Sequence, residues 1–264
     1  MALADELKAL REFRCEEGKC VLSVYLNTDR ADSEQQKGEW KIRLKNGLKR
    51  HEEYLEASEN KDQLKSFRKL RKKVENEVNG NQSQLQKSVV IFASDVDDLW
   101  SVHYMQLPVE TSFHWEEAPV LDQLTKLQQD FPKSGIVLPN MDEVKILETD
   151  LGEIQDTRIY SFDPDTGNWN YKQGMGAEDK IMSGATHTDK YDQRFQENLN
   201  RFYKDMAGNI ERLKQDRNWE ALYLVGEADP VNTLESQLRV PVDKSVKKNL
   251  NNVDTSKVLE QVFN

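Results

Sequence analysis

The sequence predicts an α/β (α+β) protein built as two units, the second of them a mixed sheet flanked by helices. Two observations support this fold class. Short runs rich in β-branched and aromatic residues are typical of strands, and they alternate with longer stretches whose apolar residues recur every three or four positions, as in amphipathic helices. A chain of 264 residues is also long enough for two ordinary domains.

We expect the first unit to span residues 1–115. It begins with the amphipathic helix ALADELKALREF and the strand CVLSVYLNT. A helical insertion at 37–78 follows, with the stretches KGEWKIRLKNGLKRHEEYLEA and DQLKSFRKLRKKVENEV. The acidic turn DVDD then joins the strands SVVIFAS and WSVHYMQL, and the segment PVETSFHWEEAP leads out of the unit.

The helical insertion is basic within an acidic chain. Between Lys37 and Lys73 there are 13 Lys or Arg and 6 Asp or Glu, a net of +7; since the whole chain carries −10, the remainder carries −17. This distribution is compatible with a localised phosphate-binding face, although a pair of solvated, lysine-rich helices is the simpler interpretation. The candidate RNA-binding residues here are Lys41, Lys45, Lys49, Arg68, Lys69 and Lys72.

We expect the second unit to span residues 116–264. The helix VLDQLTKLQQDF comes first, then the buried strand SGIVLPN and a meander of EVKILETD, TRIYSF and WNYKQ, with LGEIQD as the connection between the first two of these strands. A helix of about eight turns is predicted because apolar residues form one stripe along it. They are Tyr191, Phe195, Leu199, Phe202, Met206, Ile210 and Leu213. The strand ALYLVGE, another helix and the final helix DTSKVLEQVF complete the unit.

Composition excludes several classes of protein. No stretch approaches 18 uninterrupted apolar residues and the N-terminus is charged, which argues against a membrane span or a secretory signal and favours a cytoplasmic location. Cys15 and Cys20 are too few for a disulfide framework and lack zinc-site partners, so reduced thiols are expected. No metal and no cofactor is expected.

Several residues could bind a metal or a nucleic-acid base, but a structural role is the better interpretation of them. His103 and His114 lie on or beside strands without metal-ligand spacing. Trp40, Tyr54 and Phe67 could stack on bases, but we expect them to pin the basic helices to the sheet. Two further features argue in the same way. Asp95, Asp97 and Asp98 lack the glycine and glutamate of a calcium loop, and Asn140 stands where a ribonuclease-H-like nuclease would place an aspartate for Mg²⁺.

The segment YKQGMGAEDKIMSGATHTDKYDQRF, residues 171–195, is an unusually long polar connection between a strand and a helix. It is dotted with glycines but has neither the G-x-G-x-x-G spacing of a dinucleotide site nor a P-loop lysine.

The arrangement of these pieces resembles a known family. ELKALREFRCEEGKCVLSVYLNTD with the later strands is similar to the N-terminal domain of archaeo-eukaryotic class-1 peptide chain release factors and Pelota. PVLDQLTKLQQDFPKSGIVLPNMDEVKILETDLGEI and YDQRFQENLNRFYKDMAGNIERL resemble their middle domain. The closest resemblance is to the bacterial archaeo-eukaryotic release-factor family. It implies that the 172–188 loop corresponds to the Gly-Gly-Gln loop, which promotes peptidyl-tRNA hydrolysis in the ribosome.

The loop departs from that motif. The nearest match reads Ser183, Gly184, Ala185, Thr186 and His187, with one glycine left and no glutamine. The nearest glutamines are Gln173 and Gln193, and the dipeptide of Arg194 and Phe195 is similar to the pair that follows the family's motif. Five cations and five anions between Lys172 and Arg201 cancel, whereas a loop for an RNA-lined tunnel would more often be basic.

Two functions remain open. The departure favours a non-catalytic ribosome- or tRNA-binding protein, a translation or ribosome-rescue factor with a degenerate loop. The alternative is a peptidyl-tRNA (ester) hydrolase acting on ribosomes through residues 172–190. The candidate catalytic residues are Gly184, His187 and Gln193, although a solvated loop histidine is the simpler interpretation of His187. Arg194 joins the candidate RNA-binding residues.

The expected partners are the ribosome, tRNA or both, with no membrane. The counterparts of a stop-codon-reading tetrapeptide and of the family's GTPase-docking third domain are not found, so neither codon-specific termination nor a translational GTPase partner is expected.

Overall fold

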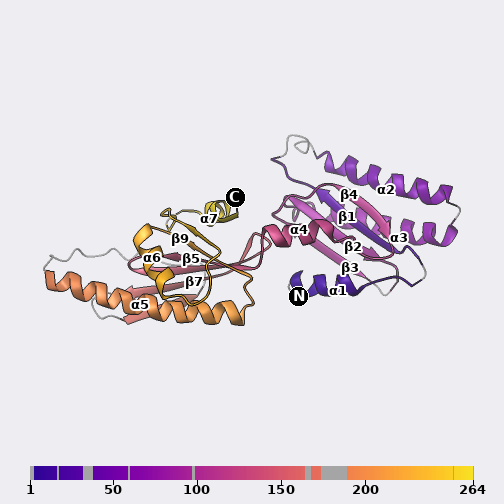
Figure 1. Cartoon of the computed structure of the whole chain (residues 1–264). Helices are drawn as coiled ribbons and strands as arrows, with labels where there is room; N and C mark the ends of the chain where they lie inside the picture. Colours follow the sequence, from indigo (N-terminus) through magenta and orange to yellow (C-terminus); the bar gives the residue numbers. More distant parts are fainter. Residues whose placement is uncertain are drawn as a thin grey trace. The chain divides into compact units, whose positions relative to one another are not determined.

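The computed structural model describes residues 3–16, 18–31, 38–58, 60–96, 99–163, 168–173, 189–251 and 253–263. The chain forms two compact units, Met1–Lys126 and Leu127–Asn264 (Figure 1), each with its own sheet. The division lies within α4 (Asp122–Asp130), later than the predicted division at 115/116. Within the part of the chain that the structure describes, no helix combines the length and apolar character needed to cross a membrane.

The first unit is built on a four-stranded antiparallel sheet in the order β3-β2-β1-β4. β1 (Val21–Asn27), β2 (Ser88–Ser94) and β3 (Trp100–Met105) are the predicted strands. β4 (Ser112–Glu116) was not predicted: the segment expected to lead out of the unit pairs with β1, with Val21 opposite Glu116 and Tyr25 opposite Ser112. This pairing joins residues about 90 positions apart, which no local pattern reveals.

The start of α4 belongs to the first unit. Gln123 donates to the carbonyl oxygen of Glu110 and to Ser112 Oγ, and the hydroxyl of Tyr25 donates to the carbonyl oxygen of Val120 at 2.6 Å. The sequence placed this helix beside the second sheet. The structure divides the helix instead: its first residues lie in the first unit, where Gln123 bonds to the segment before β4 and Val120 bonds to Tyr25 of β1, and Leu127–Asp130 lie in the second unit.

Two long helices cover one face of the first sheet. α2 (Trp40–Ala57) and α3 (Lys61–Gly80) are antiparallel neighbours, and Asn60 caps α3 by accepting a hydrogen bond from the backbone N–H of Gln63. Their buried residues share a core with β1 and β2. The helical members of that core are Trp40, Leu44, Leu48, Leu55, Phe67, Leu70, Val74 and Val78.

The N-terminal part of the first unit contains a disulfide. α1 (Leu3–Glu12) brings the Glu6 carboxylate to 3.4 Å from His103 Nε2 on β3. Cys15 and Cys20, expected as reduced thiols, are bonded across a short loop, with 6.2 Å between their Cα atoms. Their backbone N–H groups donate to the carbonyl oxygens of Glu117 and Glu116, so β4 and its extension hold both cysteines in place.

The second unit contains a six-stranded mixed sheet in the order β10-β9-β5-β6-β7-β8, as the fold class predicted. Its strands are β5 (Ser134–Pro139), β6 (Glu143–Asp150), β7 (Glu153–Asp163), β8 (Asn168–Gln173), β9 (Ala221–Val225) and β10 (Lys244–Val246). β5 is parallel to β9 and antiparallel to β6, and β9 is parallel to β10. The three-residue strand β10 was not predicted.

The connection between β6 and β7 is shorter than expected. LGEIQD was predicted as the connection, but β7 already begins at Glu153. The turn consists of Leu151 and Gly152, with φ of 48° and 69°, and positive φ at both central residues matches the twist of a tight hairpin.

Helices lie on both faces of the second sheet. α5 (Asp189–Asp216) and α6 (Ala228–Gln237) share a core with one face, and α7 (Thr255–Phe263) covers the other. Neighbouring residues of β5 divide between the faces: Val137 points to α5, and Ile136 and Leu138 point to α7. The predicted apolar stripe of α5 is confirmed from Phe195 onward, since its residues from Leu199 to Leu213 are buried.

Candidate nucleic-acid interface

The loop that the sequence singles out lies outside the described residues. This includes Gly184 and His187. Gln193 and Arg194 lie early in α5, described by their backbone alone. The described frame of the loop is therefore β8, which ends at Gln173, and α5, which begins at Asp189.

The strand that leads into the loop is firmly supported. β8 pairs with β7 along its whole length, with Tyr171 opposite Tyr160. The ring of Tyr160 lies 4.9 Å from that of Tyr171 and 5.7 Å from that of Trp169. Phe162 stacks on Phe202 of α5 at 4.9 Å, so the strand pair is attached to the helix at the other end of the loop. The strand before the loop, β8, and the helix after it, α5, are therefore attached to the same core.

At the end of β5, Asn140 is engaged with α5. The hydroxyl of Tyr203 donates to the carbonyl oxygen of Asn140 at 3.0 Å, and burial raises the pKa of this tyrosine. Asn140 is therefore bonded to α5 through its backbone. Among the described residues, no three His, Cys, Asp or Glu side chains converge as metal ligands.

The basic helices expose cations that differ in their partners. Lys41, Lys45 and Lys49 are exposed on α2, as their spacing predicted. Lys49 Nζ lies 3.2 Å from Glu53 Oε1, whereas Lys45, like Lys72 on α3, has no acidic partner among the described residues. Lys41 Nζ lies 5.3 Å from the ring centre of Trp40. Lys45 and Lys72 are therefore the candidate cations available to a phosphate.

Arg68 and Lys69 are engaged within the protein. Arg68 Nε donates to Glu52 Oε1 at 2.6 Å and its guanidinium also reaches Glu56, while Lys69 pairs with Asp95. The Glu52 carboxylate additionally bonds to Arg71, and it is only 17% exposed. The hydrogen bond from Arg68, reinforced by Arg71, lowers the pKa of Glu52. These contacts connect α2 to α3, so Arg68 stabilises the hairpin of helices.

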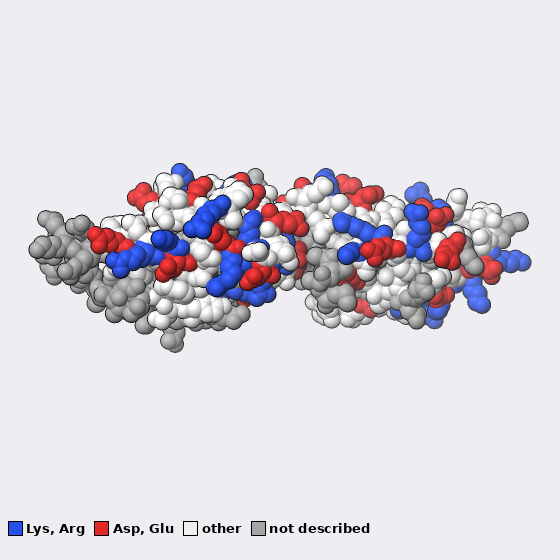
Figure 2. Space-filling model, turned by 60° about the horizontal axis from the view of Figure 1, so that its bottom comes forward, with Lys and Arg blue, Asp and Glu red and all other residues white. Residues whose placement is uncertain are grey.

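Carboxylates lie among the cations of these helices, since Glu52, Glu53, Glu56 and Glu75 each pair with a Lys or Arg. On the face of the molecule drawn in Figure 2, Lys and Arg side chains are likewise interspersed with Asp and Glu. The aromatic residues divide: Trp40 and Phe67 are buried, as expected of residues that pin helices to a sheet, but Tyr54 is 72% exposed. The count of basic residues in the sequence thus overstates the free positive charge.

The described histidines have structural partners. His103 Nε2 lies 2.8 Å from Ser101 Oγ, His114 Nε2 lies 3.1 Å from Ser112 Oγ, and His51 Nε2 lies 2.9 Å from the carbonyl oxygen of Phe113. Burial lowers the pKa of His103 and of His114. Ser101 and Glu6 both approach the same ring nitrogen of His103, so the three do not form a catalytic relay.

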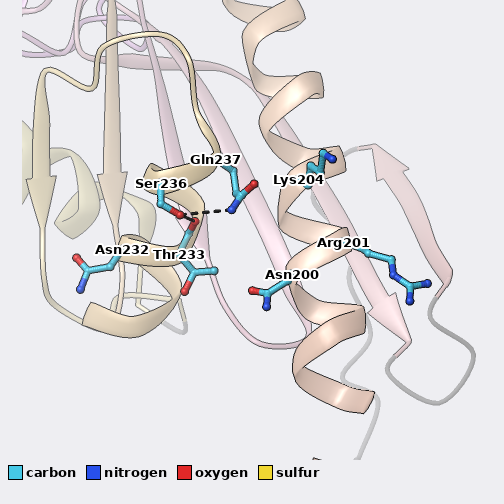
Figure 3. Close-up of a pocket in the computed structure, with 7 residues that line it drawn as sticks. All are labelled: Asn200, Arg201, Lys204, Asn232, Thr233, Ser236 and Gln237. Atoms are coloured by element: carbon cyan, nitrogen blue, oxygen red, sulfur yellow. Dashed lines mark hydrogen bonds between the residues drawn. The ribbon is translucent and has the colours of Figure 1, made fainter. Parts of the chain in front are cut away.

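A polar groove that the sequence did not predict lies between α5 and α6 (Figure 3). It has a volume of about 530 Å³. Its lining residues are Asn200, Arg201, Lys204, Asn232, Thr233, Ser236 and Gln237. No local signal marks it, because three lining residues belong to one helix and four to another that begins more than twenty residues later.

Comparisons with known proteins find a family model, a sequence relative and solved structures that are similar to this chain. The model of bacterial archaeo-eukaryotic release factor family 5 matches residues 132–264. The uncharacterized protein YocB of Bacillus subtilis (strain 168) is 34% identical over 263 residues, which cover 100% of this chain and 99% of YocB. Two solved structures each align with 98% of this chain and 72% of their own at 11% identity: an archaeal protein (TM-score 0.39) and the archaeal translation termination factor aRF1 (TM-score 0.37).

Proposed function

Because the chain belongs to bacterial archaeo-eukaryotic release factor family 5, we propose that it associates with ribosomes, tRNA or both as a translation or ribosome-rescue factor, without hydrolysing peptidyl-tRNA. One observation carries the second half of this proposal. The segment from Ser183 to His187, where the resemblance places Gly-Gly-Gln, keeps a single glycine and has no glutamine.

The missing groups are those that ester hydrolysis requires. The reaction needs a positioned water and a donor for the developing oxyanion, and the loss of one such donor commonly lowers the rate about 10²–10³-fold. Ala185 in place of a glycine also restricts the backbone conformations in which an N–H group can approach RNA closely. A chain with these changes keeps the strand and the helix that position the loop, but it lacks the second glycine and the glutamine that the hydrolysis of the ester requires.

The binding half of the proposal draws support from charge and from the frame of the loop. Lys45 and Lys72 are exposed and have no acidic partner among the residues described, so a phosphate would not compete with an internal ion pair. β8 pairs with β7, whose Phe162 stacks on Phe202 of α5, and Trp169 of β8 packs against the same core, so both ends of the segment are attached to one core.

The alternative is a peptidyl-tRNA hydrolase that uses the 172–190 loop. Gly184 favours it, because a glycine remains where the motif would turn, and Gln193 follows within α5. In this alternative, Gln193 or His187 would orient the water.

Two measurements test the proposal. Cell lysate is sedimented through a sucrose gradient, and purified protein is assayed on peptidyl-tRNA with and without ribosomes. We expect the protein to sediment with ribosomal particles and the hydrolysis rate to equal the background. Sedimentation only at the top of the gradient, together with no binding to purified tRNA, contradicts the proposed association. Hydrolysis above background that Gln193→Ala or His187→Ala abolishes establishes the alternative instead.

A further inference from the structure

We propose that the groove between α5 and α6 binds the ribose-phosphate backbone of single-stranded RNA. This inference rests on the proposed function in its choice of RNA as partner, but the site itself is read from the second unit alone. Its volume of about 530 Å³ lies within the range of about 300–1,000 Å³ that ligand sites usually occupy.

The groove is formed by two helices that cannot shift independently. α5 and α6 both pack on the second sheet, and Leu199, Tyr203, Val231 and Leu234 of the two helices are buried in the same core. In Figure 3, Asn200 of α5 and Gln237 of α6 point toward the space between the helices, while Arg201 and Lys204 extend from the outer side of α5. Amides therefore line the interior and cations form the rim.

The hydroxyl groups of the groove are oriented as acceptors. Thr233 Oγ1 donates to the carbonyl oxygen of Asp229 at 2.8 Å, and Ser236 Oγ donates to that of Thr233 at 2.7 Å. Each hydroxyl hydrogen is thus used inside α6. Ser236 Oγ also accepts from Gln237 Nε2 at 3.4 Å, so it keeps one lone pair for an incoming donor, and Thr233 Oγ1 keeps its acceptor capacity as well. A ribose 2′-hydroxyl is such a donor, and it distinguishes RNA from DNA.

The amides and cations supply donors for phosphate oxygens. Arg201 and Lys204 have no acidic partner among the described residues, and they extend from the outer side of α5, whereas the amide of Asn200 faces α6 (Figure 3). Two acids of these helices have other partners: Glu211 accepts from the backbone N–H of Arg239 at 2.6 Å, and Glu235 accepts from Ser245 Oγ. Glu197, one turn before Arg201, and Asp205, next to Lys204, are exposed acids that would weaken a phosphate contact.

The lining selects a backbone over a base or an apolar ligand. All seven lining residues are polar and none is aromatic, so the groove offers no face on which a base could stack. Its lining residues also include no aliphatic side chain of the kind that would hold a lipid or a hydrophobic peptide. Sugar hydroxyls and phosphates are the groups that this set of acceptors, donors and cations matches.

The first test removes the rim charges. The full chain carrying Arg201→Gln and Lys204→Gln is compared with the wild type for binding to a labelled single-stranded RNA of mixed sequence over a range of salt concentrations. We expect affinity to fall about tenfold, and the slope of log affinity against log salt to decrease by about 0.7 for each lost phosphate contact. Unchanged affinity and slope would overturn the proposal.

A matched control carries the same change of charge on the opposite face of the sheet. Lys257 is an exposed cation on α7, and Lys248 is an exposed cation in the segment before that helix. The double variant Lys248→Gln, Lys257→Gln should leave RNA affinity at the wild-type value. An equal loss of RNA affinity in this control would show that net charge alone controls binding, and it would refute the RNA site in the groove. Glu197→Gln should have the opposite effect and raise affinity severalfold; a decrease counts against the site.

The second test concerns the hydroxyls. Thr233→Val with Ser236→Ala should lower binding to RNA severalfold and leave binding to DNA of the same sequence unchanged, so that the preference for RNA falls. Equal effects on RNA and DNA, or none, contradict the role assigned to these acceptors. Far-ultraviolet circular dichroism and the thermal midpoint verify that each variant is folded.

These outcomes separate the groove from the proposed function. In one outcome, the groove variants and the wild type sediment equally with ribosomes and bind RNA with equal affinity. This result refutes the RNA site in the groove and leaves the proposed function standing. If the wild type binds neither ribosomes nor tRNA but binds single-stranded RNA through the groove, the proposed function fails and the site stands. A wild type that binds no RNA of any kind refutes both.

Discussion

The hairpin of α2 and α3 and the groove of α5 and α6 are both candidate RNA-binding surfaces, but they hold their charges in different ways. The hairpin is the more basic in sequence, yet Lys49, Arg68, Lys69 and Arg71 all pair with carboxylates. The groove has only two cations, and neither has an acidic partner among the residues described. The difference teaches that the charge available to a ligand depends on contacts within the fold rather than on composition.

The units also differ in how their helices are attached. α5 and α6 pack on the sheet through a continuous apolar core, whereas α2 and α3 combine such a core with ion pairs between the helices. Apolar packing is insensitive to salt and pH, and ion pairs respond to both. Mutations in the two regions should therefore differ in their dependence on conditions.

The largest effect should come from the unpaired cations of the hairpin. Charge reversal at Lys45 and Lys72 should lower ribosome or tRNA affinity about 100-fold, since each lost contact forfeits counterion release and adds repulsion. Thermal stability should stay near the wild-type value because both side chains are exposed. The same reversal at Lys248 and Lys257 is the control, and binding that the hairpin variant retains in full removes this face from consideration.

Next in size is a packing change in the second unit. A Cβ atom on Gly135 of β5 would lie 2.2 Å from the ring of Trp219, which is buried, so Gly135→Ala should destabilise the unit by about 1–3 kcal/mol. Urea unfolding measures the change, which should be equal at low and high salt. Gly208→Ala on α5, where a Cβ atom meets nothing within 4 Å, is the comparison without overpacking and should stabilise the unit by about 0.5–1 kcal/mol, because alanine favours the helix over glycine. A loss that varied with salt would argue against overpacking as its cause.

A smaller and pH-dependent effect is expected in the hairpin. Glu52→Gln removes the charge that bonds to Arg68 and Arg71 and should destabilise the first unit by about 1–2 kcal/mol at pH 7. Because the folded protein lowers the pKa of Glu52, this stabilisation is present above the unfolded pKa of about 4.3 and is lost as pH falls through the lower, folded value. Chemical denaturation at pH 7 and at about pH 3 should show the variant and the wild type converging.

The smallest effect belongs to the exposed pair of Lys49 and Glu53, whose side chains are 61% and 60% exposed. Changing both to Gln should alter stability by less than about 0.5 kcal/mol. If Lys49 nonetheless binds phosphate, Glu53→Gln alone should strengthen RNA binding by releasing it. Unaltered RNA binding in Glu53→Gln would place Lys49 outside the interface.

Most of the fold could be predicted from the sequence, and the exceptions share a cause. The helix of α5 follows from a stripe of apolar residues, and β1, β2, β5 and β9 follow from short β-branched runs. β4 was missed because SFHWE becomes a strand only by pairing with β1, and the three residues of β10 are too few for a periodic signal. The disulfide of Cys15 and Cys20 likewise depends on a loop held against the extension of β4.

The candidate sites divide in the same way. The sequence alone determined the amphipathic helices, the buried strands and which residue types stand at positions 183–187, because periodicity and residue identity are local properties of a chain. Only the tertiary structure decided which cations are free and where amides and hydroxyls converge. Arg68 meets Glu52 from 16 residues away, Lys69 meets Asp95 from 26, and the groove joins Asn200 to Gln237. Such contacts form when helices pack on a common sheet, and a linear pattern carries no record of that packing.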